Sequence, residues 1–148
     1  MRSAIVERAL DPAALVAEVS GPAHGALVLF VGTVRDTNEG RAVTGIEYTA
    51  YRAMAERELA DIVREAEQQF EGARVAAEHR LGTLGLGEAS VAVAVAHGHR
   101  AAAYEASRYV IEEIKRRLPI WKREHYAGGA REWVHAGTGG ADALAMAR

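Results

Sequence analysis

The hydrophobic and polar positions of the chain follow two periods, and these predict a mixture of helices and strands. Apolar residues recur every three or four positions between residues 52 and 70 and again before residue 118, which is typical of two long amphipathic helices. Shorter runs, either continuously apolar or alternating, indicate strands. The predicted strands are at residues 5–6, 26–31, 43–51, 74–81, 90–96 and 131–134.

The two long helices carry the clearest patterns, because each has an apolar face opposite a charged one. The apolar face of the first consists of Ala55, Leu59, Ile62, Val63, Ala66 and Phe70. The inner stripe predicted for the second consists of Tyr104, Ser107, Ile111, Ile114 and Leu118. Pro119 ends the second helix, because proline lacks an N–H group and disfavours helical geometry in the residue before it.

The order of these elements predicts an α+β fold with a mixed or antiparallel sheet. A short helix is expected at residues 12–19, because Asp11 can cap it and Pro12 suits its first position. The apolar run 26–31 is typical of a buried strand, and we expect 43–51 to form a hairpin or a nearby antiparallel pair with it. Without internal repeats, the chain is predicted to form a single domain over residues 1–136, followed by a partly disordered Gly/Ala-rich tail over 137–148.

Composition restricts the classes of function. With 49% hydrophobic and 26% charged residues, the 148-residue chain can bury the core of one domain. A net charge of −2 argues against binding nucleic acid or a membrane surface through bulk charge, so any cationic site must be local. The absence of cysteine excludes disulfides and thiolate chemistry, so any sulfur chemistry would need sulfur from elsewhere. No apolar run is long enough to span a bilayer, and we expect a cytoplasmic protein.

Cationic residues gather where predicted helices and strands begin or end. Arg35 follows the strand at 26–31, His99 and Arg100 precede the second long helix, Lys115 lies in its last turn at the margin of the inner stripe, and Lys122 lies just beyond it. Arginine binds phosphate or carboxylate through its planar fork, and the pKa of a lysine falls when other cations or burial disfavour protonation. If these groups converge, they form an anion pocket with an amine base.

Other kinds of site have weaker support. His97 and His99 could ligate a metal from one side of a strand, but no acidic or cysteine partner has suitable spacing. The glycines at 82, 85 and 87 lack the Lys-Ser/Thr of a phosphate-binding P-loop and precede no predicted helix, so we interpret them as a turn. Lys115 and Lys122 could also be surface lysines near a helix end. We therefore expect no metal and no cofactor, with lysine as the catalytic group.

Several segments together resemble the molybdopterin synthase catalytic (large) subunit family. The most specific is the Lys-x-x-x-Pro-x-Trp-Lys-x-Glu string from Lys115 to Glu124, and the resemblance runs in order from about residue 25 to residue 134. The other segments are Phe30 to Arg35, Tyr48 to Ala55, His79 to Gly82, and His99-Arg100.

The resemblance implies an α/β-hammerhead-like fold, a homodimer, and a small ubiquitin-like partner at each end, together a heterotetramer. The partner's C-terminal Gly-Gly thiocarboxylate would deliver sulfur to cyclic pyranopterin monophosphate, forming the dithiolene of molybdopterin. Lys115 and Lys122 would be catalytic. The substrate-binding residues would be Thr33, Val34, Arg35, His99, Arg100, Lys115, Lys122, Arg123 and Glu124.

The chain departs from the family pattern at two positions. Gly137 stands where the pattern has an arginine that reaches a neighbouring subunit's pocket, and Ile111 stands where a methionine is frequent. Arg131, His135 or a partner residue could replace the missing charge. Two other functions remain open: a lysine-dependent lyase that forms a Schiff base with a phosphorylated carbonyl compound, and a noncatalytic adaptor that receives a partner tail.

Overall fold

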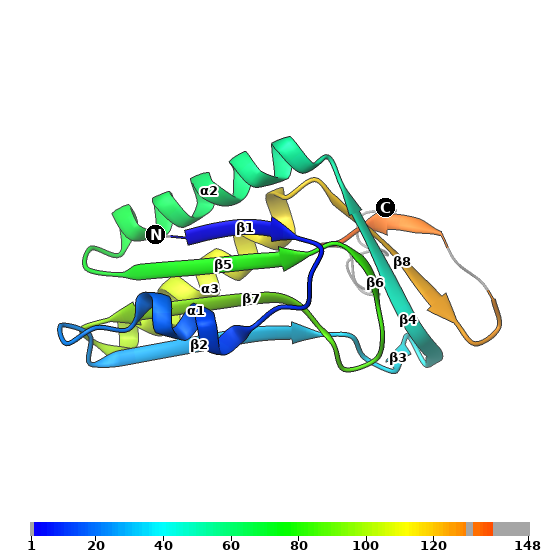
Figure 1. Ribbon diagram of the computed structural model, residues 1–148, viewed down its shortest axis with the longest axis horizontal. Coiled ribbons are helices and arrows are strands. Elements are labelled where there is room, and N and C mark those ends of the chain that lie inside the picture. The colour runs from blue at the N-terminus through cyan, green and yellow to red at the C-terminus, as the bar shows by residue number, and fades with distance from the viewer. Residues whose placement is uncertain (1, 130–131, 138–148) are drawn as a thin grey trace.

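The computed structural model describes residues 2–129 and 132–137. Three helices and nine strands are present in these residues (Figure 1). In chain order they are β1 (Arg2–Val6), α1 (Pro12–Val19), β2 (Ala26–Thr33), β3 (Thr37–Asn38), β4 (Arg41–Ala50), α2 (Arg52–Gln69), β5 (Arg74–Arg80), β6 (Gly82–Leu84), β7 (Ala89–His97), α3 (Arg100–Arg117), β8 (Ile120–Tyr126) and β9 (Trp133–His135).

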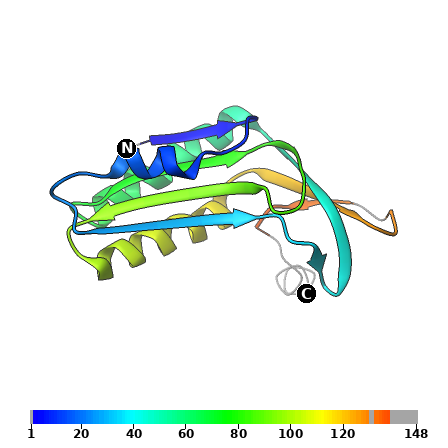
Figure 2. The same ribbon diagram turned by 60° about the horizontal axis from the view of Figure 1, so that its bottom comes forward.

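A four-stranded sheet with the order β1-β5-β7-β2 forms the centre of the molecule. β1 and β5 are parallel, whereas the other neighbours are antiparallel. Alternate side chains of β5 and β7 point to opposite faces: Val75 and Val93 pack with α2 and α3, and Ala76 and Ala94 pack with α1. Figure 2 shows α1 and α3 on opposite faces of this sheet. Two hydrophobic cores therefore share one sheet.

A second sheet extends from one end of the first (Figure 1). Its strands have the order β3-β4-β8-β9, and β6 also pairs with β4. β8 begins two residues after the C-cap of α3 at Leu118, so the end of α3 lies where the two sheets meet. The predicted α+β fold and the two long helices, each of 18 residues, are confirmed.

The strand at 26–31 is present, but the prediction that it is buried is wrong. β2 is an edge strand, because among the described strands only β7 pairs with it, and Leu27 and Leu29 are 45% and 41% exposed. It does not pair with β4, which belongs to the second sheet. β3, β6 and β8 have no counterpart among the predicted strands. The sequence of β8 does not alternate between polar and apolar residues, because polar side chains lie on both of its faces.

The inner face predicted for the second long helix is shifted in the structure. Tyr104 is 64% exposed, whereas Ala103, Ala106 and Val110 are fully buried. Small side chains allow α3 to lie close to the sheet, so the contact face follows these residues instead of the larger aromatic one. Pro119 does follow the last turn as predicted, and the Leu118 N–H closes that turn on the Ile114 carbonyl at 3.1 Å.

Candidate functional site

A cavity of about 220 Å³ lies at the junction of the two sheets and the end of α3. Six of the nine predicted substrate-binding residues line it: Thr33, Val34, Arg35, Lys115, Lys122 and Glu124. Sequence reasoning missed other lining residues, including Phe30, Asn38, Tyr48 and Ser90. All four lie within strands of the structure, and in the sequence Phe30, Tyr48 and Ser90 only contribute to the pattern of a predicted strand.

The turn after α3 brings the two lysines together. α3 ends at Arg117, and Pro119 directs the chain into β8, which returns along β4. Side chains alternate along a strand, so Lys122 and Glu124 point to the same side, toward the cavity. Lys122 pairs in register with Tyr48 of β4. Residues from a helix and a strand thus contribute to one site.

The two lysines have different surroundings. Lys122 Nζ lies 3.3 Å from Glu124 Oε1, and both side chains are mostly buried. In the described part of the chain, no carboxylate lies within ion-pair distance of Lys115. Burial, and then the positive charge of Lys122, lower the pKa of Lys115 from its ordinary value. Lys115 is therefore more readily deprotonated than an ordinary lysine.

Behind the lysines lies a group of buried neutral side chains. The ring of Tyr48 meets the ring of His79 edge to face, with 5.1 Å between centroids. His79 Nδ1 lies 2.9 Å from the Arg80 carbonyl oxygen and donates to it, while burial and the nearby Lys115 charge lower the pKa of His79 to about 3. Burial also raises the pKa of Tyr48. Both side chains therefore remain neutral at physiological pH.

Arg123 points away from the cavity. It lies between Lys122 and Glu124 on β8, so strand alternation directs it to the opposite face of the sheet. There its guanidinium donates to Glu47 Oε1 at 2.7 Å and stacks over the Trp133 ring at 4.5 Å. Arg123 therefore lies on the face of the sheet opposite Lys122 and Glu124, where it joins β4, β8 and β9, and its role in substrate binding stays a prediction.

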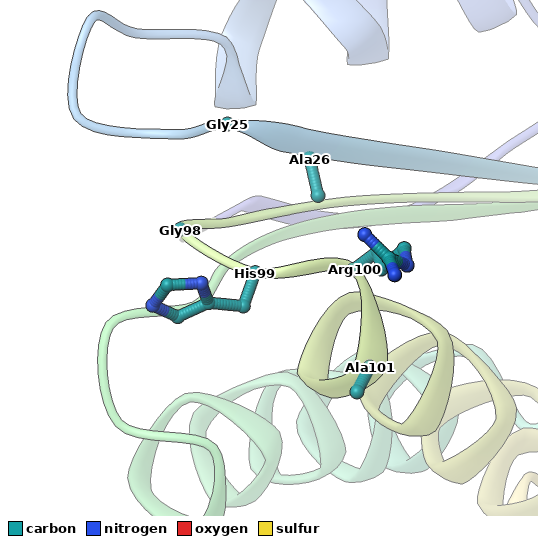
Figure 3. A pocket seen from close by; sticks show the side chains of 6 residues that line it. All are labelled: Gly25, Ala26, Gly98, His99, Arg100 and Ala101. Carbon is teal, nitrogen blue, oxygen red and sulfur yellow. The ribbon is translucent and has the colours of Figure 1, made fainter.

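His99 and Arg100 lie at the other end of α3. Arg100 and Lys115 are the first residue and a last-turn residue of this helix, so they are separated by about 22 Å at 1.5 Å per residue. His99 and Arg100 line a different cavity of about 440 Å³ with Gly25 and Gly98 (Figure 3). Within one chain, they cannot contact a small substrate that is also bound by the lysines.

The histidine pair considered as a metal site is engaged in structural contacts. His97 Nε2 lies 2.9 Å from the Glu71 carbonyl oxygen, and His97 Nδ1 accepts from the His99 N–H at 3.0 Å. Both ring nitrogens of His97 are thus occupied. Residues 2–129 and 132–137 contain no group of three or more His, Asp or Glu side chains arranged to hold a metal ion. No helix within these residues is long and apolar enough to cross a membrane.

The segment after β9 that carries Gly137 packs directly against the last turn of α3, which carries Lys115. A Cβ atom added to Gly137 would lie 1.9 Å from the Lys115 carbonyl oxygen, so a side chain at this position requires a backbone shift. His135 Nε2 lies 2.8 Å from the Leu118 carbonyl oxygen and donates to it, while His135 Nδ1 accepts from the Gly137 N–H at 3.2 Å. His135 therefore serves as a cap for α3, and Arg131 lies outside the described residues.

Residues 5–117 match the MoaE protein family. The chain is 43% identical over 129 residues to the molybdopterin synthase catalytic subunit of Thermoplasma volcanium, covering 87% of this chain and 94% of that protein. It is 46% identical over 124 residues to the subunit of the same name from Aspergillus clavatus, covering 84% of this chain. It spans only about 63% of that longer fungal relative.

Solved structures agree with the sequence comparison. Molybdopterin synthase from Staphylococcus aureus superimposes with a TM-score of 0.83 at 35% identity, covering 88% of this chain and 94% of that one. A chain in the complex of subunits 1 and 2 of molybdopterin-converting factor from Helicobacter pylori superimposes with a TM-score of 0.72 at 25% identity, covering 89% of each chain. The chain therefore belongs to the MoaE family of molybdopterin synthase catalytic subunits.

Proposed function

We propose that this chain transfers sulfur from the thiocarboxylated C-terminus of a small ubiquitin-like carrier to cyclic pyranopterin monophosphate, forming the dithiolene of molybdopterin. The observation that carries this proposal is the meeting of Lys115 and Lys122 in one cavity with Arg35 at its rim. The carrier tail and the substrate phosphate are both anions, and a cationic pocket stabilises them. The carrier brings the sulfur as its thiocarboxylate, so the chain needs no cysteine of its own.

The solved complex of subunits 1 and 2 of molybdopterin-converting factor from Helicobacter pylori supports the proposal that this chain binds a carrier subunit. An extended Gly-Gly tail has no side chains, so it would occupy little of a cavity of about 220 Å³. Two copies of this chain and two carriers would form the heterotetramer. A cytoplasmic location stays a prediction.

The two lysines have different roles in the proposed reaction. Lys122, whose Nζ lies 3.3 Å from Glu124 Oε1, would hold the thiocarboxylate or the substrate phosphate. Lys115, with its lowered pKa, has an amine that can take up a proton when water or a substrate hydroxyl reacts. Thr33, Val34 and Arg35 form the side of the cavity through which an anionic substrate would enter.

We further propose that His99 and Arg100 reach this cavity from a second copy of the chain. They lie about 22 Å along α3 from the lysines of their own chain, too far for one small substrate. The edge strand β2 provides the contact surface, because it has an unpaired edge and exposes Leu27, Leu29 and Phe30. Phe30 also lines the lysine cavity, so this surface is continuous with the site.

A mixing experiment tests the shared site. Arg100→Ala and Lys115→Ala are each expected to inactivate the enzyme, but a re-equilibrated mixture should regain about a quarter of wild-type activity, because half of the dimers contain one intact site of two. The measurement is the rate of molybdopterin formation after the two variants are mixed. If the mixture stays as inactive as its components, Arg100 does not act across the dimer. Recovery of Lys115→Ala chains with an affinity-tagged Arg100→Ala chain, measured by intact mass, gives the reference for subunit exchange.

The conversion assay tests the function itself. The chain is mixed with cyclic pyranopterin monophosphate and a thiocarboxylated carrier, with a carrier ending in an ordinary carboxylate as the control. Molybdopterin is expected only with the thiocarboxylate. Borohydride trapping of a substrate on Lys115 or Lys122 would instead support the Schiff-base lyase. Carrier binding by the folded chain without any conversion would support the adaptor.

A further inference from the structure

Sulfur transfer from a thiocarboxylate requires a second reaction at the carrier. This inference rests on the proposed function. When the sulfur attacks a substrate carbon, a C–S bond forms and an oxygen leaving group departs with its electron pair. The sulfur is then still bonded to the acyl carbon of the carrier, as a thioester. Water must add to that carbon, after which the acyl C–S bond breaks, the thiolate stays on the substrate, and the carrier leaves as a carboxylate.

Hydrolysis of this thioester places negative charge on the acyl oxygen. Enzymes that catalyse such reactions aim fixed hydrogen-bond donors at this oxygen, and each donor contributes a large part of the rate. The lysines are already assigned to the anions and to proton transfer. A neutral donor within the same cavity is therefore needed, close to Lys122 and held by its surroundings.

Tyr48 meets these requirements. It lines the cavity together with both lysines, it lies opposite Lys122 in the strand register, and it is only 7% exposed. Its ring is fixed edge to face against His79, with 5.1 Å between centroids. Ser90, which also lines the cavity and is 4% exposed, lies within hydrogen-bonding reach of the Tyr48 hydroxyl.

The hydroxyl proton of Ser90 is donated to a backbone carbonyl and not to Tyr48. Ser90 Oγ donates to the Gly32 carbonyl oxygen at 3.3 Å, and a serine hydroxyl has one proton to donate. Ser90 Oγ can then accept a hydrogen bond from the Tyr48 hydroxyl, which can turn toward an oxygen of a bound tail. We propose that Tyr48 is a catalytic residue that donates a hydrogen bond to the acyl oxygen of the carrier during thioester hydrolysis, and that Ser90 positions its hydroxyl.

The protonation state of Tyr48 supports this role. Burial raises the pKa of Tyr48, so the hydroxyl keeps its proton at physiological pH, whereas burial and the Lys122 charge lower the pKa of Lys115. A lysine that serves as a base is uncharged when it accepts a proton, and a neutral amine is a weaker hydrogen-bond donor than an ammonium group. The tyrosine supplies a neutral donor that stays protonated at this pH.

Replacement of Tyr48 by phenylalanine tests the inference. The chain is mixed with thiocarboxylated carrier and cyclic pyranopterin monophosphate, and samples quenched over time are examined by intact mass for a carrier–pterin conjugate. In Tyr48→Phe, the conjugate is expected to form at close to the wild-type rate but to decay about 10²-fold more slowly, so it accumulates. Ser90→Ala should slow the same step by a smaller factor. Tyr51→Phe, which changes a tyrosine that is 65% exposed and outside the cavity, should resemble wild type.

Three results would overturn the inference. Wild-type decay of the conjugate in Tyr48→Phe would show that the hydroxyl is not used. Equal slowing of conjugate formation and decay, in both Tyr48→Phe and Ser90→Ala, would indicate a structural role. If the wild-type chain formed neither conjugate nor product, both the proposed function and this inference would fail. The first two results differ from this one, because in them the wild-type chain still converts the substrate.

Discussion

Replacement of Lys115 by alanine is expected to reduce molybdopterin formation by about 10²- to 10⁴-fold, the range typical of losing a general acid or base. The fold should persist, because no ion pair in the described part of the chain depends on Lys115. Carrier binding should also persist, since Lys122, Glu124 and Arg35 still line the cavity. The measurement is single-turnover conversion of cyclic pyranopterin monophosphate, together with a titration of carrier binding.

The matched control is Arg116→Ala, since Arg116 lies in the same turn but its side chain is 70% exposed. The pH profile checks the reason for the loss. Lys115 acts as a neutral amine, so the wild-type rate should rise with pH through a pKa below that of an ordinary lysine, and Lys122→Met should move this rise to higher pH because it removes the neighbouring charge. Full activity of Lys115→Ala would exclude Lys115 as the base.

Introduction of arginine at Gly137 is expected to damage the enzyme, although the family pattern has an arginine there. A Cβ atom at this position would lie 1.9 Å from the Lys115 carbonyl oxygen and 2.8 Å from its carbonyl carbon. Either the end of β9 or the last turn of α3 must move, at a cost of about 1–3 kcal/mol for overpacking of this kind. Both a lower Tm and a loss of activity are expected, because the displaced turn carries Lys115.

Gly137→Ala should also lower both the Tm and the activity, since the Cβ atom alone causes the clash. The matched control is Gly128→Ala, because a Cβ at Gly128 would meet nothing within 4 Å and this glycine does not have a positive φ. Thermal unfolding and the conversion assay measure the two effects. Gly137→Arg with wild-type stability and equal or higher activity would contradict the prediction, and would show that the turn can admit the family arginine.

Local pattern was sufficient for most helices and strands. The period of apolar residues gave α2, and Asp11-Pro12 and Pro119 marked where α1 begins and α3 ends, because capping and the missing proline N–H act over a few residues. The Lys-x-x-x-Pro-x-Trp-Lys-x-Glu string also brought Lys115, Lys122 and Glu124 into one predicted site, and they line one cavity. The short distance along the chain made this inference possible.

The amino-acid sequence was sufficient to predict the local structure, the family and the residues near the turn after α3. It did not reveal that β2 is an exposed edge, that Arg123 faces away from the cavity, that His99 and Arg100 lie at the far end of α3, or that Tyr48 and Ser90 lie behind the lysines. Periodicity and capping depend on neighbours along the chain, whereas the burial of a strand and the direction of its faces depend on which distant segments pair with it.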